Sequence, residues 1–278
     1  IFTLLFGGAV GAMHGFNGKG YELTQQLASN LGFNNSIVPN RTSLETSINY
    51  LLALSFQGMI LGKIANEIYI LMSQSINEIS EKQTKGQVGS STMPHKVNPV
   101  IILQVIEEAA ILRGKTSTTI EAGMPLHEGD LRYNKIVDNL IKDSTVLSLK
   151  LSLKFNSLLN NLLINSKQMQ RNLLNEKDYI ASENLMYKLG KYLGRQEAHD
   201  LIHLIIKKSV KNNLGAKKQF LNDPIISKYF TAADVEKILN PLKYIGESKK
   251  ISLKMSKFGV KKATEILARS TSKNLLIK

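Results

Sequence analysis

The stretch INYLLALSFQGMILGKIANEIYILMSQSINEISE, residues 48–81, decides the fold class. Apolar side chains recur in it at roughly every fourth position, at residues 48, 52, 56, 60, 64, 68 and 71. This spacing places them on one face of an α-helix, and no proline interrupts the run. Gly58 and Gly62 within it are small enough to let a neighbouring helix pack closely. The stretch therefore predicts an amphipathic helix of about thirty residues.

Similar patterns continue further along the chain. Two more apolar runs, at about residues 100–113 and 133–174, predict helices. Segments rich in polar residues, glycine or proline separate the runs, at residues 32–43, 82–99 and 116–130. No comparable alternation of apolar and polar residues predicts strands. We therefore expect an all-α fold in which unusually long helices form a bundle.

The pattern changes after about residue 178. Shorter helical segments follow, with breaks expected at Gly190, Gly194, Gly215, Pro224 and Pro241. We expect residues 1–178 to form a central helical-bundle domain that carries the loop 82–99. Residues 179–278 are expected to form a smaller C-terminal helical domain.

The composition excludes several kinds of site. The chain has no cysteine, so it has no disulfide and no thiolate chemistry. Its five histidines include no HExxH motif, and we expect no bound metal. The apolar segment 1–13 is too short to span a bilayer and contains a glycine pair. We therefore expect neither a transmembrane helix nor a signal peptide.

The net charge of +14 is concentrated toward the C-terminus. Residues 179–278 contain 20 Lys and Arg against 8 Asp and Glu, a net charge of +12, which leaves +2 for the first 178 residues. A basic region of this kind could bind nucleic acid. Its lysines are spread along helical patterns without an aromatic platform. We therefore favour a solvated lysine-rich surface, and we expect no nucleic-acid partner.

The loop GQVGSSTMPHKVNPV, residues 86–100, has a composition suited to ligand binding. Its glycines permit unusual backbone conformations, and Ser90 and Ser91 supply hydroxyl groups. Lys96 and Asn98 add one cation and one amide. Such a set can cradle a carboxylate or a phosphate. The same composition also fits a polar linker between helices, and composition alone leaves both interpretations open.

The consecutive residues GSSTMPHKVNP, 89–99, closely resemble the signature of the aspartase/fumarase superfamily, in the form found in adenylosuccinate lyases and carboxymuconate cycloisomerases. Further resemblances follow in the family's order, namely GGAVGAM (7–13), LHEGD (126–130), LGRQEAHDLI (193–202) and LNPLKYIG (239–246). The resemblance covers nearly the whole chain but begins part-way through the family's length. We therefore expect a chain that lacks the family's N-terminal part, and whether it is active or inactive alone as a fragment stays open.

The resemblance implies a lyase that performs a β-elimination and releases fumarate from a succinyl-type substrate, as adenylosuccinate lyase does in purine metabolism. It implies Ser90 as the general base, and as substrate-binding residues Ser91, Lys96, Asn98, His127 and Glu128. It further implies a small anionic dicarboxylate-type substrate, no cofactor and no membrane. The expected protein is cytoplasmic, and a homotetramer whose active sites are shared between subunits.

The chain departs from the family pattern at three places. Leu103 stands where an acidic residue is usual, and Gly129 stands where the family has arginine. The upstream segment whose histidine often serves as general acid is not in the chain. In addition, the serine and arginine with which typical adenylosuccinate lyases recognise a nucleotide phosphate have no counterpart in RYNKIVDN (132–139). Other interpretations therefore stay open: a carboxymuconate cycloisomerase-like enzyme, an inactive helical scaffold, or a basic nucleic-acid-binding protein. His127 and Glu128 could also simply cap the helix that follows them.

Overall fold

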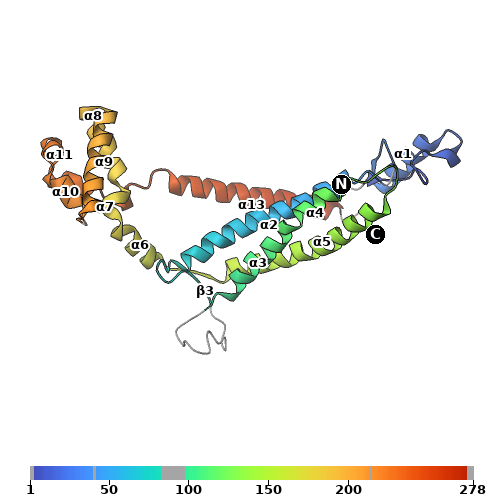
Figure 1. Ribbon diagram of the computed structural model, residues 1–278, viewed down its shortest axis with the longest axis horizontal. Helices are drawn as coiled ribbons and strands as arrows, with labels where there is room; N and C mark the ends of the chain where they lie inside the picture. Colours follow the sequence, from blue (N-terminus) through green and yellow to red (C-terminus); the bar gives the residue numbers. More distant parts are fainter. Residues whose placement is uncertain (1–2, 40–41, 83–97, 213, 274–278) are drawn as a thin grey trace. The chain divides into compact units, whose positions relative to one another are not determined.

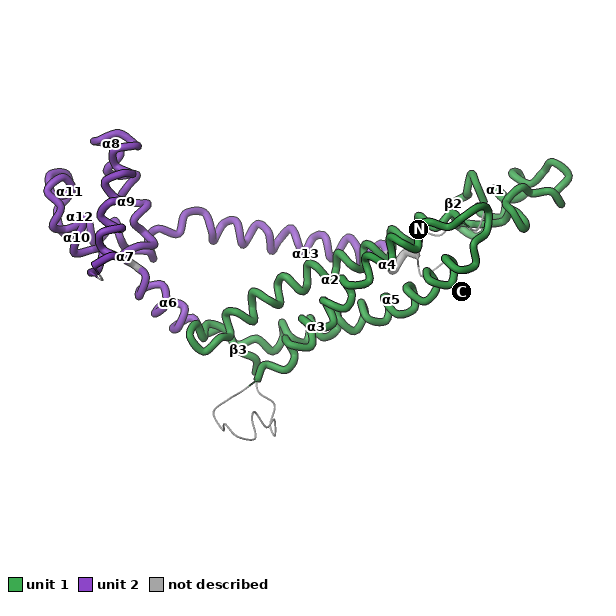
Figure 2. The backbone as a smooth tube through the Cα atoms, viewed as in Figure 1, with its two compact units in different colours: residues 1–165 green, residues 166–278 purple. Residues whose placement is uncertain are grey.

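The computed structural model describes residues 3–39, 42–82, 98–212 and 214–273. The chain forms two compact units, residues 1–165 and 166–278, which Figure 2 shows in different colours. The domain boundary that the sequence places after residue 178 stays a prediction.

Helices dominate both units, which confirms the expected all-α fold (Figure 1). In chain order, unit 1 contains β1 (Thr3–Leu4), η1 (His14–Phe16), α1 (Gly20–Leu31), β2 (Asn34–Asn35), α2 (Glu45–Leu71), β3 (Ile79–Glu81), α3 (Val100–Gly114), α4 (Thr116–Glu121), α5 (Leu131–Asn160) and β4 (Leu162–Ile164). Unit 2 contains α6 (Ser166–Asn175), α7 (Lys177–Ile180), α8 (Ser182–Leu193), α9 (Arg195–Lys211), α10 (Ala216–Asn222), α11 (Pro224–Tyr229), α12 (Ala232–Ile238), η2 (Pro241–Lys243) and α13 (Ser248–Lys273). The short strands, which the sequence did not predict, pair as β1 with β2 and β3 with β4.

Helices α2, α3 and α5 pack on one another along their lengths and form the bundle of unit 1 (Figure 1). Small residues let α2 approach α3. A Cβ atom added at Gly58 would lie 3.1 Å from the carbonyl oxygen of Ala109, and one at Gly62 would lie 3.1 Å from the Ala109 Cβ. Arg113 Nη1 donates a hydrogen bond of 3.0 Å to the Gly58 carbonyl. The close helix packing predicted for the two glycines is thus confirmed.

The large apolar side chains of α2 lie mainly on a different face from its buried residues. Phe56, Ile60 and Ile64 are 60%, 52% and 41% exposed, although they belong to the stripe from which the helix was predicted. The buried positions between them are mostly small, such as Ser55 and Ala65. By length and composition, α2 could also cross a membrane, and 28% of its most apolar window is buried. The middle of the apolar stripe, at Phe56, Ile60 and Ile64, is therefore uncovered within one chain, whereas Ile68 near its end is buried.

Two of the predicted helices end earlier than expected. The helix predicted to reach residue 81 stops at Leu71, and the chain then passes through Asn77, whose φ is +50°, into β3. The third helix stops at Asn160 rather than near residue 174, because the chain there enters β4. The apolar pattern continues through both points, but antiparallel pairing of β3 with β4 replaces the helix. The segment 116–130, expected to be non-helical, contains α4.

Unit 2 has its own core, in which α8 and α9 pack together and α10, α11 and α12 contact them. Phe220, Leu185 and Leu189 are fully buried there. Gly194, with φ of +88°, separates α8 from α9 as expected, whereas the break predicted at Gly190 is wrong because α8 runs through it. The expectation of only short helices is also wrong for α13, which has 26 residues.

Candidate active site

Only part of the signature segment lies within the described residues. The predicted general base Ser90 falls outside them, as do the predicted substrate-binding residues Ser91 and Lys96. Asn98 is exposed and lies directly before Pro99, the N-cap residue of α3. The segment therefore leaves β3 at one end and enters α3 at the other.

These two ends are held together. The carboxylate of Glu81, the last residue of β3, accepts hydrogen bonds from the backbone N–H groups of Ile101 (3.2 Å) and Ile102 (2.7 Å). The backbone N–H of Lys82 donates to the carbonyl of Asn161 at 2.8 Å, directly after α5. The segment 82–99 thus starts and ends at the C-terminal end of α5. Glu81 is not among the site residues predicted from the sequence.

Leu103 occupies the position where the family has an acidic residue, and its side chain is 42% exposed on α3. Gln104 next to it is also exposed. The departure therefore places an apolar side chain on an open face of the first turns of α3. It does not disturb the helix or its buried side, where Ile102 and Val105 are fully buried.

Two of the other motifs come together at the opposite end of the bundle. A cavity of about 390 Å³ is lined by Ala9, Val10, His127, Glu128, Gly129, Leu131 and Asn134. Segments 7–13 and 126–130, far apart in the sequence, therefore share one cavity. His127 has a φ of +55°, a conformation that residues other than glycine adopt rarely and that is found often at functional sites. The structure thus places His127 and Glu128, two of the predicted substrate-binding residues, in one cavity with Ala9 and Val10 of the other motif.

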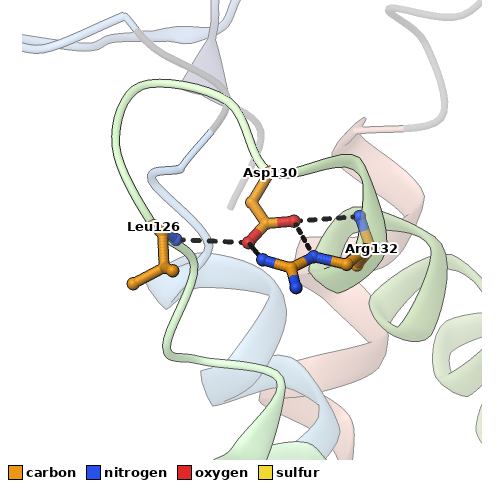
Figure 3. Close-up of polar contacts among 3 residues, drawn as sticks. All are labelled: Leu126, Asp130 and Arg132. Carbon is orange, nitrogen blue, oxygen red and sulfur yellow. Dashed lines mark hydrogen bonds and ion pairs between the residues drawn. The ribbon is translucent and has the colours of Figure 1, made fainter.

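Asp130 orders the start of α5 (Figure 3). Its Oδ1 accepts from the backbone N–H of Arg132 (3.1 Å) and from Arg132 Nε (3.0 Å), while Oδ2 accepts from Arg132 Nη2 (2.8 Å). Oδ2 also receives a long hydrogen bond of 3.5 Å from the backbone N–H of Leu126. Asp130 is buried and is the N-cap of α5, so the interpretation of His127 and Glu128 as the cap is wrong.

The ion pair changes the charge behaviour of both partners. Hydrogen bonding from the Arg132 side chain holds the pKa of Asp130 below its ordinary value of 3.8, against the opposing effect of burial. The same bond raises the pKa of Arg132. Because a bidentate contact to Asp130 fixes its guanidinium, Arg132 has less capacity to bind a further anion. The sequence carried a signal for the cap, since an aspartate directly before a helical run is a common N-cap.

The two groups of candidate residues lie far apart within one chain. The start of α3, directly after Asn98, is bound to β3 and so lies at the C-terminal end of α5, whereas the segment with His127 and Glu128 immediately precedes the N-terminal end of α5. Figure 1 shows α3, α5 and β3 in this arrangement. α5 has 30 residues and is therefore about 45 Å long. No small substrate can contact both groups of one chain at once.

Two histidines and a tyrosine from the C-terminal motifs have structural contacts. His199 is exposed, its Nδ1 lies 3.0 Å from Asp200 Oδ1, and its ring stacks on that of His203. The hydroxyl of Tyr244 donates to Glu183 Oε2 at 2.7 Å, and this bond raises the pKa of Tyr244 to about 12. These contacts, all within unit 2, indicate structural roles for His199 and Tyr244. Among the described residues, no three His, Asp or Glu side chains are grouped as metal ligands.

Comparison with known proteins adds to this picture. Residues 1–111 match the family described as "Lyase", and residues 178–254 match "Adenylosuccinate lyase C-terminus". The N-acetyl-S-(2-succino)cysteine lyase of Dickeya dadantii (strain 3937) is 30% identical over 242 residues, which are 87% of this chain and 53% of that protein. The adenylosuccinate lyase of Archaeoglobus fulgidus is 29% identical over 244 residues, 87% of this chain and 55% of that protein.

A solved structure gives a similar result. The 3-carboxy-cis,cis-muconate lactonizing enzyme from Pseudomonas putida superposes with a TM-score of 0.75 and 26% identity. The superposition covers 88% of this chain and 55% of that one. The chain thus spans about half the length of the relatives it matches.

Proposed function

Because the chain belongs to the aspartase/fumarase superfamily of lyases, we propose that its protein catalyses a β-elimination that releases fumarate from a succinyl-type substrate. Adenylosuccinate is the preferred candidate, which would place the protein in purine metabolism. Support comes from the adenylosuccinate lyase C-terminal match and from relatives named as lyases of succinylated compounds. We also propose a cytoplasmic location, which fractionation of cells that express the protein would test.

In the proposed reaction, Ser90 removes the proton next to a substrate carboxylate. Lys96 and Asn98 bind that carboxylate and stabilise the negative charge that spreads onto it, with Ser91 assisting by hydrogen bonding. A serine hydroxyl can act as a base only where nearby donors and a cation stabilise its alkoxide. His127 and Glu128 contact a more distant part of the substrate. No cofactor takes part, because the chemistry needs only proton transfer and carboxylate binding.

The separation of Asn98 from His127 and Glu128 along α5 indicates how the proposed active site is assembled. If both groups serve one site, they must come from different copies of the chain. Copies whose bundles lie antiparallel would bring the start of α3 in one copy to the 126–130 segment of another. We therefore propose a homotetramer in which each active site is shared between subunits.

Uncovered apolar surface supports this assembly. On α5, Val146, Leu149 and Leu153 are 54%, 60% and 63% exposed, and they add to the exposed stripe of α2. Exposed apolar side chains on neighbouring helices of one bundle need partners to cover them.

The exposed stripe of α2 fits a protein partner better than lipid. Gln57 Nε2 donates to Ser152 Oγ of α5 at 2.6 Å, and Asn66, Lys63 and Glu67 also lie on α2. Charged and amide side chains in the middle of a helix are costly in a bilayer. We therefore propose that α2 packs in the core of the assembly and does not span a membrane.

A carboxymuconate cycloisomerase-like activity is the second candidate. The 26% identity to the lactonizing enzyme favours it, as does the contact that fixes Arg132 on Asp130. The chain thereby lacks a free arginine directly after the 126–130 motif for a nucleotide phosphate. A lactonizing activity does not require one.

One absorbance screen separates these proposals. The protein, as its gene encodes it, is mixed in turn with adenylosuccinate, argininosuccinate, N-acetyl-S-(2-succino)cysteine and carboxymuconate. The proposed function predicts formation of fumarate from one of the first three, and loss of that activity in Ser90→Ala. Conversion of carboxymuconate alone would select the second candidate. No conversion of any of the four compounds would favour the inactive scaffold.

A further inference from the structure

α3 begins without a cap of its own. Its N-cap residue is Pro99, which makes no side-chain capping bond, and its first turn contains no acidic residue. The backbone N–H groups of the first turn of a helix have no partner within the helix. In most helices a Ser, Thr, Asp or Asn at the N-cap accepts from the N–H groups of the second and third residues. In α3 these are Ile101 and Ile102.

Glu81 takes the place of the missing cap. Its Oε2 accepts from the Ile101 N–H at 3.2 Å and its Oε1 from the Ile102 N–H at 2.7 Å. One carboxylate therefore serves both groups, from a residue 20 and 21 positions earlier in the chain. Negative charge at the amino end of a helix is also favourable to the helix dipole.

The backbone of Glu81 is itself fixed. Glu81 pairs with Leu162 in the β3–β4 ladder, and the next residue, Lys82, bonds to Asn161. The carboxylate therefore joins the start of α3 to the strand pair at the end of α5. It closes a connection of which Lys82 and Pro99 are the two ends.

We propose that Glu81 is a positioning residue for the active site: it holds the start of α3, and with it Asn98, in a fixed place relative to the β3–β4 pair. The kinetic part of this inference rests on the proposed function, in which Asn98 binds the substrate carboxylate. Without Glu81, the Ile101 and Ile102 N–H groups lose their partner and the first turn of α3 frays. Displacement of a binding group by about 1 Å can cost about 100-fold in rate.

The first test compares Glu81→Ala with the wild-type protein, as its gene encodes it. Amide hydrogen exchange at Ile101 and Ile102 is expected to accelerate at least about tenfold, and kcat/KM to fall by about 10- to 100-fold. Glu121→Ala is the matched control, because Glu121 is exposed in α4, beyond the other end of α3. It is expected to leave both quantities unchanged. Wild-type exchange and kcat/KM in Glu81→Ala would overturn the inference.

A second test separates positioning from simple helix stability. Pro99→Asp supplies a local cap to α3 that does not connect to β3. In the Pro99→Asp background, adding Glu81→Ala is expected to leave Ile101 and Ile102 protected while kcat/KM still falls by about tenfold. If the double variant matches Pro99→Asp alone in kcat/KM, the local cap suffices and the positioning role is wrong.

The two readouts also separate this inference from the proposed function. If the wild-type protein turns over none of the candidate substrates, the proposed function fails, and the exchange measurement alone decides whether Glu81 ties the start of α3 to β3. If the wild-type protein is active and Glu81→Ala is equally active, the proposed function stands and the inference about Glu81 fails.

Discussion

The starts of α3 and α5 both lie beside candidate site residues, but their capping carboxylates come from different distances along the chain. At α5 the carboxylate belongs to Asp130, the residue directly before the helix, which also fixes Arg132 two positions later. At α3 it belongs to Glu81, which lies 21 residues before Ile102. The two starts lie at opposite ends of the same bundle.

The two helix starts are therefore held by contacts of different kinds, one between neighbours in sequence and one between distant segments. The cap at the start of α5 is made by neighbours in sequence, Asp130 and Arg132. The α3 end needs the β3–β4 pair and the end of α5 in place first, because Glu81 is positioned by both. We therefore expect the α3 end to carry the chemistry that depends on exact placement, and the 126–130 end to contribute binding.

Replacement of the proposed base should have the largest effect. Ser90→Ala is expected to lower kcat by about 10²- to 10⁴-fold with KM nearly unchanged, because only the proton transfer is lost. Steady-state kinetics on the substrate found by the screen measure both constants. Ser29→Ala, at an exposed position of α1, is the control and should be indistinguishable from wild type. Unchanged kcat in Ser90→Ala would remove the assignment.

Substitutions at the 126–130 end should change mainly KM. His127→Ala combined with Glu128→Ala removes two exposed side chains that line the 390 Å³ cavity. We expect KM to rise by about 10- to 100-fold with a smaller change in kcat, because hydrogen bonds to the bound substrate are lost. A large fall in kcat at constant KM would show that this end takes part in the chemistry, and would contradict the division of chemistry and binding between the two ends.

The bundle that keeps the two ends apart depends on close contact between α2 and α3. Gly58→Val is expected to cost about 1–3 kcal/mol of unfolding free energy, because its Cβ meets the Ala109 carbonyl and Leu112. Chemical denaturation measures this. Gly259→Ala in α13 is the contrasting variant, since nothing lies within 4 Å of an added Cβ there, and it should stabilise by up to about 1 kcal/mol.

The smallest effect concerns the charge of Asp130. Asp130→Asn keeps a residue suited to capping but removes the ion pair with Arg132. Because the folded-state pKa of Asp130 is lowered, wild type should be more stable than the variant above pH 3.8. This advantage should disappear as pH falls below 3.8 and through the folded-state pKa. Melting temperatures of both proteins across pH 2–7 test the sign, and an advantage that grows toward low pH would contradict it.

Local patterns in the sequence predicted much of the fold. The spacing of apolar residues located α2, α3 and α5, and Gly58 with Gly62 indicated where two helices come close. The ends of α2 and α5 were missed because β3 and β4 are about 80 residues apart in the chain and pair only in the folded protein. Sequence periodicity has no access to such a contact.

The same reason explains what was missed at the candidate site. Asp130 could have been identified, since it directly precedes the helix that it caps. Glu81 could not, because nothing near it in sequence shows that it reaches Ile101 and Ile102. The apolar pattern of α2 likewise does not tell what covers it: side chains such as Phe56 and Ile60 remain exposed in a single chain. The pattern that predicts a helix does not say whether its apolar face meets the same chain or another copy.

In the proposed assembly, one active site combines the α3 end of one copy with the 126–130 end of another. Mixing subunits tests it directly: Ser90→Ala protein and the His127→Ala/Glu128→Ala protein, each nearly inactive when the substrate is kept below KM, are co-expressed in equal amounts. Random assembly should restore about one quarter of wild-type activity, because that share of sites receives both intact ends. Activity that stays at the level of the separate variants would show that each site is built within a single chain, and would contradict the account.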